Sequence, residues 1–138
     1  MIRRVVFAAA ATIALAAAPV LAAGVEKAPP GGAFKKLSDL VDLPEFMPGL
    51  GTLYVDPKTL PQGPFLAYDR AGVLVSTVYM IPLKDFETHR KIDALDAPGG
   101  NVDHVDMSYN AGHPGVEEPH YHVILWHIKK ADEARVAK

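Results

Sequence analysis

Prolines and glycines divide this chain into short segments, and this division most constrains the fold that it can adopt. The 138 residues include 12 prolines and 11 glycines. Between residues 43 and 64 these are dense enough to predict a loop-rich stretch with one short strand at 52–55. Further breaks fall at Pro82 and at residues 97–100. The pattern therefore predicts short elements joined by turns.

Two segments have the periodicity of short helices, and two others have the composition of paired strands. Apolar residues recur at helical spacing in 33–41 and in 84–95. β-Branched and aromatic residues are concentrated in 65–68 and 73–81, and the Asp-Arg-Ala-Gly sequence between them is typical of a turn. We therefore expect a β-hairpin between two short helices.

The last third of the chain predicts a second pair of strands. Residues 102–109 alternate between apolar and polar side chains, and residues 120–128 form the final strand. A loop containing glycine and proline joins them at 110–119. The fold that we expect is α+β, with an antiparallel sheet, open or barrel-like, and one or two short helices.

The N-terminus has the pattern of a cleavable signal peptide over residues 1–22. Arg3 and Arg4 form a positive segment, an apolar run follows at 5–18, and Val-Leu-Ala at 20–22 resembles a cleavage site. The alternative is a transmembrane anchor, but the apolar run is shorter than the roughly 20 residues that a spanning helix needs. We expect a protein of the periplasm or a secreted protein that spans no membrane after cleavage.

The rest of the chain is predicted to form one domain. Residues 23–33 contain Pro-Pro-Gly-Gly, which predicts a flexible lead-in. Residues 34–130 are predicted to form the globular body, and residues 131–138 are predicted to form a charged tail. Without Arg3 and Arg4 the chain has 12 basic and 16 acidic residues, which argues against nucleic acid as a partner. Cysteine is absent, so packing, a bound ion or a homo-oligomer must supply the stability.

Histidines cluster near the C-terminus, and their spacing predicts a metal site. Five of the six histidines fall in the last third of the chain. His120 and His122 are two residues apart on a predicted strand, so both imidazoles point to the same side. Imidazole is a ligand for zinc and copper among other transition metals. We therefore expect a bound metal ion, Zn or Cu.

The register between the last two strands decides which residues join this pair. In the register that we favour, the facing pairs are Ser108 with His120, Asp106 with His122, and His104 with Ile124. His104 and Asp106 then share a face with the His120–His122 pair, and His113 in the loop is a further ligand. In a register shifted by one residue, Tyr109 and Met107 face the pair instead, and the thioether would favour copper.

Two other functional interpretations stay open. The histidines could complete a polar core or a subunit interface of a non-enzymatic envelope protein, hydrogen-bonded to Asp106, Glu117 or Glu118. Residues 115–122 also look like the first metal-binding motif of cupins, but the glutamate that follows in cupins is replaced by Val-Ile-Leu-Trp. No nucleophile elbow, phosphate loop or dinucleotide fingerprint is present, which favours a protein without enzymatic activity.

The block from Val102 to Ile128 resembles a family of small exported bacterial proteins of unknown function, whose type member is controlled by an envelope-stress sigma factor. The shared pattern is a histidine on an early strand, a Gly-His-Pro loop and a Pro-His-x-His strand. The resemblance implies an antiparallel sheet and oligomers, and it points to His104, His113, His120 and His122 as the site residues. It implies no activity.

Overall fold

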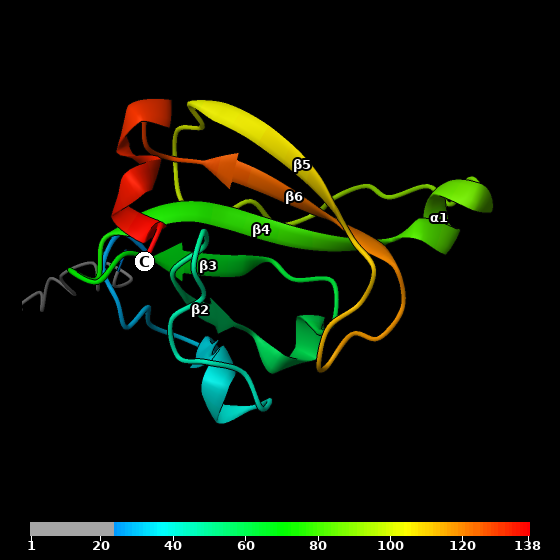
Figure 1. The fold of residues 1–138 in the computed structure, drawn as a ribbon, viewed down its shortest axis with the longest axis horizontal. Coiled ribbons are helices and arrows are strands. Elements are labelled where there is room, and N and C mark those ends of the chain that lie inside the picture. Colours follow the sequence, from blue (N-terminus) through cyan, green and yellow to red (C-terminus); the bar gives the residue numbers. More distant parts are fainter. Residues whose placement is uncertain (1–23) are drawn as a thin grey trace, which may run out of the picture.

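The computed structural model describes residues 24–138, and the predicted signal peptide lies outside this range. Six strands form one antiparallel sheet in the order β1-β2-β3-β4-β6-β5 (Figure 1). The strands are β1 (Lys35–Lys36), β2 (Thr52–Val55), β3 (Phe65–Tyr68), β4 (Leu74–Pro82), β5 (His104–Asn110) and β6 (His120–Trp126). The helical elements are η1 (Leu37–Asp39), η2 (Pro57–Thr59), α1 (Leu83–Glu87) and η3 (Lys130–Val136).

The sheet confirms the predicted antiparallel architecture but is not closed into a barrel. β1 and β5 stand at opposite ends of the strand order, so the sheet is open. β3 and β4 form the predicted hairpin, with a register shift between Ala67 and Tyr68. In the part of the chain that is described, no helix is long and apolar enough to cross a membrane.

Both predicted helices are corrected by the structure. Residues 33–41 form β1 and the single turn η1, because Lys35 and Lys36 pair with β2. The second helix ends at Glu87 rather than at residue 95, since His89 and Ala94 have φ values of 55° and 54°, outside the right-handed helical region. Thr77 donates a hydrogen bond to the Pro98 carbonyl oxygen at 2.6 Å, which holds this segment along β4.

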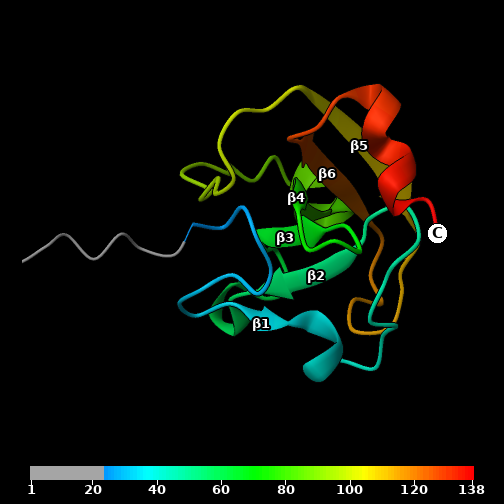
Figure 2. The same ribbon diagram turned by 90° about the vertical axis from the view of Figure 1, so that its left-hand side faces the viewer.

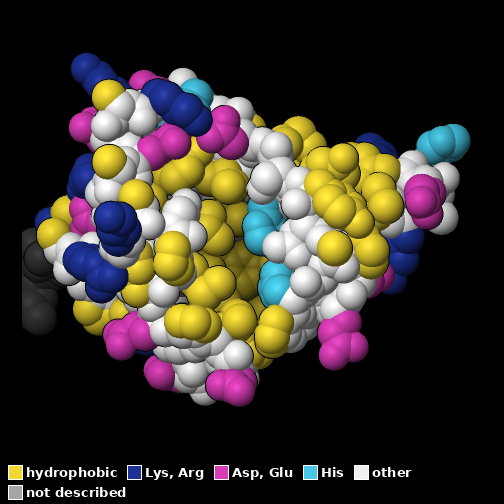
Figure 3. All heavy atoms as spheres, viewed as in Figure 1, with side chains coloured by type: hydrophobic (Ala, Val, Ile, Leu, Met, Phe, Trp, Pro, Cys, Tyr) yellow, Lys and Arg dark blue, Asp and Glu magenta, His cyan; other side chains and the backbone are white. Residues whose placement is uncertain are grey.

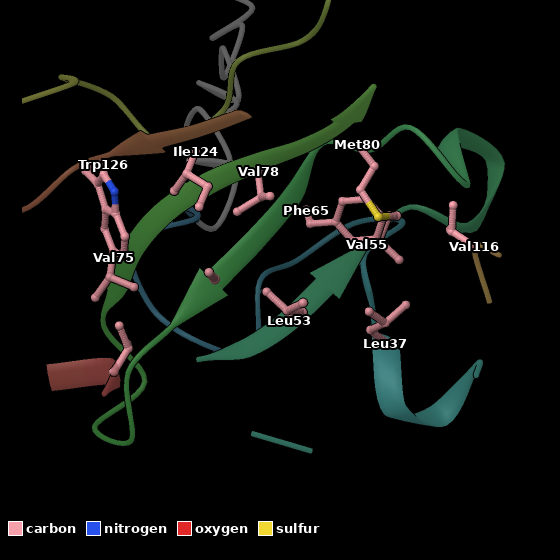
Figure 4. Close-up of a cluster of buried hydrophobic side chains, with 12 residues drawn as sticks. Leu37, Leu53, Val55, Phe65, Val75, Val78, Met80, Val116, Ile124 and Trp126 are labelled. Carbon is pink, nitrogen blue, oxygen red and sulfur yellow. The ribbon is translucent and has the colours of Figure 1, made fainter. Parts of the chain in front are cut away.

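The two faces of the sheet carry separate hydrophobic clusters. Alternate residues of β3 point to opposite faces, so Phe65 and Ala67 join one cluster while Leu66 and Tyr68 join the other. The larger cluster packs side chains of β2, β3, β4 and β6 with Leu37 of η1 (Figure 4). The histidine side of β6 lies on this face, because Ile124 and Trp126 belong to the same cluster.

Both ends of the described chain pack on the sheet. Val25 and Ala28, in the predicted lead-in, contact the smaller cluster, and the Tyr68 hydroxyl donates to the Val25 carbonyl oxygen at 2.6 Å. The predicted tail contains most of η3, and Val136 is 1% exposed within the larger cluster. Figure 2 shows η3 on the same side of the sheet as the loop that precedes β2. There, the Gly49 amide donates to the Val136 carbonyl oxygen at 2.6 Å.

Candidate metal centre

The register between β5 and β6 differs from both registers considered above. Ser108 pairs with His122, Asp106 with Ile124, and His104 with Trp126. This register is offset by two residues from the favoured one, so His104 and Asp106 keep the predicted face of the sheet but lie further from the histidine pair. An offset of an even number of residues preserves the face because side chains alternate along a strand.

The offset separates the five predicted ligands into two groups. His113, His120 and His122 form one group, in which one ligand atom from each residue lies within 4.8 Å of the others. His104 and Asp106 form the second group together with Glu133 of η3, which no sequence pattern indicated. The two groups lie near opposite ends of β6.

A tight turn places His113 beside β6. Pro114 and Gly115 occupy the turn, Gly115 has a φ of 89°, and the amides of His113 and Val116 each donate to the other residue's carbonyl oxygen at 2.9 Å. Proline followed by a residue with positive φ is typical of a type II turn. Val116 is 9% exposed and packs in the larger cluster, which anchors the turn to the body.

The side chains of the first group converge on one point. Ring centroids are 4.9 Å apart for His113 and His120, 5.8 Å for His113 and His122, and 5.0 Å for His120 and His122. The Nε2 atoms of His120 and His122 are 3.1 Å apart. Two imidazole nitrogens bound to one tetrahedral zinc ion are about 3.3 Å apart, so this separation is close to that of a shared ion.

Backbone carbonyl groups orient two of these imidazoles. The Nδ1 atom of His120 lies 2.7 Å from the Glu118 carbonyl oxygen, and Nδ1 of His113 lies 3.0 Å from the Pro114 carbonyl oxygen. A carbonyl oxygen only accepts, so each Nδ1 carries the proton and each Nε2 keeps its lone pair in the neutral ring. A hydrogen bond from the second ring nitrogen is the usual support of a metal-bound histidine.

The surroundings of His122 favour its neutral form. Burial, together with the nearby rings of His120 and His113, lowers the pKa of His122 to about 4. Because a metal ion binds the deprotonated nitrogen, few protons compete for this residue near neutral pH.

The second group is an ion-pair network. Nδ1 of His104 lies 2.8 Å from a carboxylate oxygen of Asp103, and Nε2 lies 2.7 Å from one of Glu133, so both ring nitrogens act as donors. The hydrogen bond with Glu133, followed by that with Asp103, raises the pKa of His104. Asp106 accepts from Trp126 at 3.0 Å and from Lys130 at 3.1 Å. Although its geometry could admit an ion, both ring nitrogens of His104 are already engaged as donors, and Lys130 supplies positive charge. The arrangement therefore favours the role of joining η3 to β5.

A small apolar pocket adjoins the first group. Its volume is about 140 Å³, and its lining consists of Leu37, Leu43, Met47, Leu50, Leu53, Phe65, Val78, Met80, Asn110, His113 and His122. Figure 3 shows histidine side chains at the rim of a hollow whose surface is mostly hydrophobic. The sequence contained the signal for the Pro-Gly turn, but nothing in it predicted a pocket beside the histidines.

The fold and this site define a small, mostly β protein with a histidine group that could bind a metal. No known protein-family profile matches the chain, and no curated protein matches it. It is similar to a protein of known structure, the hypothetical protein TTHB210 from Thermus thermophilus, with 50% sequence identity and a TM-score of 0.62. The match covers 69% of this chain and 93% of that one. The chain therefore belongs to the same family as TTHB210.

Proposed function

We propose that this protein binds a divalent transition metal ion, zinc or copper, through Nε2 of His113, His120 and His122. The observation that carries the proposal is the convergence of three imidazoles, two of which have Nδ1 held by a backbone carbonyl oxygen. Neutral, preoriented imidazoles bind first-row metals without a large cost of reorganisation. Three protein ligands also leave a fourth coordination position, as in catalytic rather than structural zinc sites.

Metal titration of the purified protein tests this function. We expect one equivalent of Zn²⁺ or Cu²⁺ to bind in calorimetry and to raise the melting temperature. His122→Asn should remove binding, whereas His89→Asn, which replaces an exposed imidazole with a residue that tolerates positive φ, should retain it. Absence of stoichiometric binding to the unaltered protein, for both metals, would refute the proposal.

We also infer that the protein is exported, because residues 1–22 have the pattern of a signal peptide. Expression of the full chain in a bacterium and N-terminal sequencing of the periplasmic fraction should show a mature protein that begins near Ala23. Retention of residues 1–22 in a cytoplasmic protein would contradict this inference.

One observation favours a second candidate function, a structural role in a homo-oligomer. Val105, Met107 and Tyr109 are each more than half exposed on the outer face of the edge strand β5. An apolar face on an edge strand is a common site of association between chains. Light scattering should show an oligomer that Met107→Glu dissociates, and a monomeric unaltered protein would exclude this role.

A further inference from the structure

The apolar pocket and the histidine group share two residues, His113 and His122. Their imidazoles therefore belong both to the candidate metal centre and to the pocket wall. Apart from these two rings and Asn110, the lining is aliphatic, aromatic or thioether. On the sheet, Met80 of β4 is the register partner of His122, so the pocket wall continues directly from the metal ligand.

No histidine, cysteine, aspartate or glutamate among the described residues supplies a fourth ligand to the centre. The group of three histidines includes no carboxylate among residues 24–138. Glu118, the nearest acidic residue in sequence to His120, forms an ion pair with Lys84 at 2.8 Å, and Glu117 is exposed. Asn110 accepts a hydrogen bond from the Gly112 amide at 2.9 Å. The fourth position is therefore available to an exogenous group.

The pocket has the size of one small apolar group. A protein cavity of about 150 Å³ lined by leucine, isoleucine and phenylalanine is large enough to bind benzene, and this pocket is about 140 Å³. An unfilled apolar cavity of this size lowers the stability of a small domain, and an apolar ligand that fills it restores the lost contacts.

We propose that the centre binds a small molecule with a metal-coordinating head and an apolar tail of about six carbons or one aromatic ring, with the tail in this pocket. The inference rests on the proposed metal site and specifies its ligand. The head takes the fourth coordination position, and the tail contacts Leu50 and Met80. A molecule with only the head or only the tail would make one of these two contacts. We therefore expect tight binding to require both the metal ion and a tail of suitable length.

The experiment uses the full chain loaded with Co²⁺, whose visible spectrum reports both metal binding and the arrival of a further ligand. The probes are alkyl hydroxamates of two, four, six and ten carbons. Each buried methylene strengthens binding by roughly fourfold. Hexanohydroxamate should therefore bind at least tenfold more tightly than acetohydroxamate, and the ten-carbon probe should gain nothing further because its tail exceeds the pocket.

A matched pair of variants locates the tail. Leu50 lines the pocket and is partly exposed, so Leu50→Trp should fill the pocket. Hexanohydroxamate and acetohydroxamate should then bind with affinities within about twofold of each other. Leu40 is 40% exposed and outside the pocket lining, so Leu40→Trp should keep the preference. If Leu50→Trp does not fold, the chain-length series of the unaltered protein decides.

The outcomes separate this inference from the proposed function. Cobalt bands with no chain-length preference, or with a preference that persists in a folded Leu50→Trp variant, would overturn the inference and leave the metal site standing. Failure of the unaltered protein to bind Zn²⁺, Cu²⁺ or Co²⁺ would overturn the proposed metal site and this inference with it.

Discussion

The Nε2 atoms of His120 and His122 lie 3.1 Å apart on one face of β6, and His120 is completely buried. The hydrogen bond from Nδ1 of His120 to the Glu118 carbonyl oxygen fixes the orientation of that ring. Because packing and this hydrogen bond hold His120 in place, its position would require no rearrangement to accept a metal ion. His113, in contrast, is held on a turn between two strands.

This difference predicts an unequal contribution of the ligands. Loss of a residue that only hydrogen-bonds to a metal ligand weakens binding by roughly 10- to 100-fold. His120→Asn removes a ligand itself, so it should weaken zinc binding by more than about 100-fold. His113→Asn should weaken it less, because His120 and His122 remain on one strand with their Nε2 atoms 3.1 Å apart. Competition with a chromogenic chelator measures both affinities, and equal losses in the two variants would contradict this ranking.

Gly112 is predicted to position His113. Its φ is 125°, and a Cβ atom there would lie 2.4 Å from the Glu117 carbonyl oxygen. Gly112→Ala must therefore shift the loop, and we expect zinc affinity to fall at least tenfold while the free energy of unfolding falls by about 1–3 kcal/mol. Gly100→Ala is the control, because Gly100 also has positive φ but has no atom within 4 Å of the added Cβ. Equal zinc affinities in the two variants would show that the loop does not depend on Gly112.

Arg135 is predicted to be a partly buried polar tie between the C-terminal segment and the turn that joins β3 to β4. Asp69 is 7% exposed and accepts hydrogen bonds from the Val73 amide at 2.8 Å and from Nε of Arg135 at 2.9 Å. Burial acts to raise the pKa of Asp69, but these hydrogen bonds outweigh it and lower the pKa. Arg135→Ala leaves a buried carboxylate short of a partner, so we expect a loss of about 2–3 kcal/mol in urea unfolding.

The control for Arg135 is a fully solvated ion pair. Lys91 and Asp93 form an ion pair at 2.8 Å, with the lysine side chain 84% exposed. Lys91→Ala should change the free energy of unfolding by less than about 0.5 kcal/mol. If both variants lost the same small amount of stability, the tie between Asp69 and Arg135 would have no special importance.

His104 is predicted to make stability depend on pH. Hydrogen bonds with Glu133 and Asp103 raise its pKa in the folded protein. The folded state therefore binds this proton more tightly, and the stabilisation is complete below the unfolded pKa of about 6.5 and is lost as pH rises through the folded value. His104→Gln should be less stable than the unaltered protein near pH 6. The difference between their free energies of unfolding should be smallest at high pH.

Urea unfolding between pH 5.5 and 9 measures this difference, and taking the difference between the two proteins removes the contribution of other titrating groups. His89→Asn serves as the control, since His89 is exposed. A difference between His104→Gln and the unaltered protein that did not change with pH would rule out this ion-pair role.

Local sequence signals predicted the strands well and the helices poorly. The hairpin of β3 and β4 follows from two β-rich segments around a turn, and both strands lie where composition placed them. The helix expected at 84–95 fails because Phe86 and Leu95, part of its apolar stripe, are 46% and 37% exposed, with no core to bury that stripe. Short amphipathic helices depend on tertiary packing, which a periodic pattern does not reveal.

The sequence by itself determined the antiparallel sheet, the turn that carries His113 and the shared face of His120 and His122, because each depends on neighbours within a few residues. Only the tertiary structure decided the register of β5 against β6. That register placed His104 and Asp106 with Glu133, away from the other histidines, and the packing of η1 and the loop before β2 created the apolar pocket. Registers two residues apart keep the same side chains on the same face, so face periodicity cannot distinguish them, and long-range packing must do so.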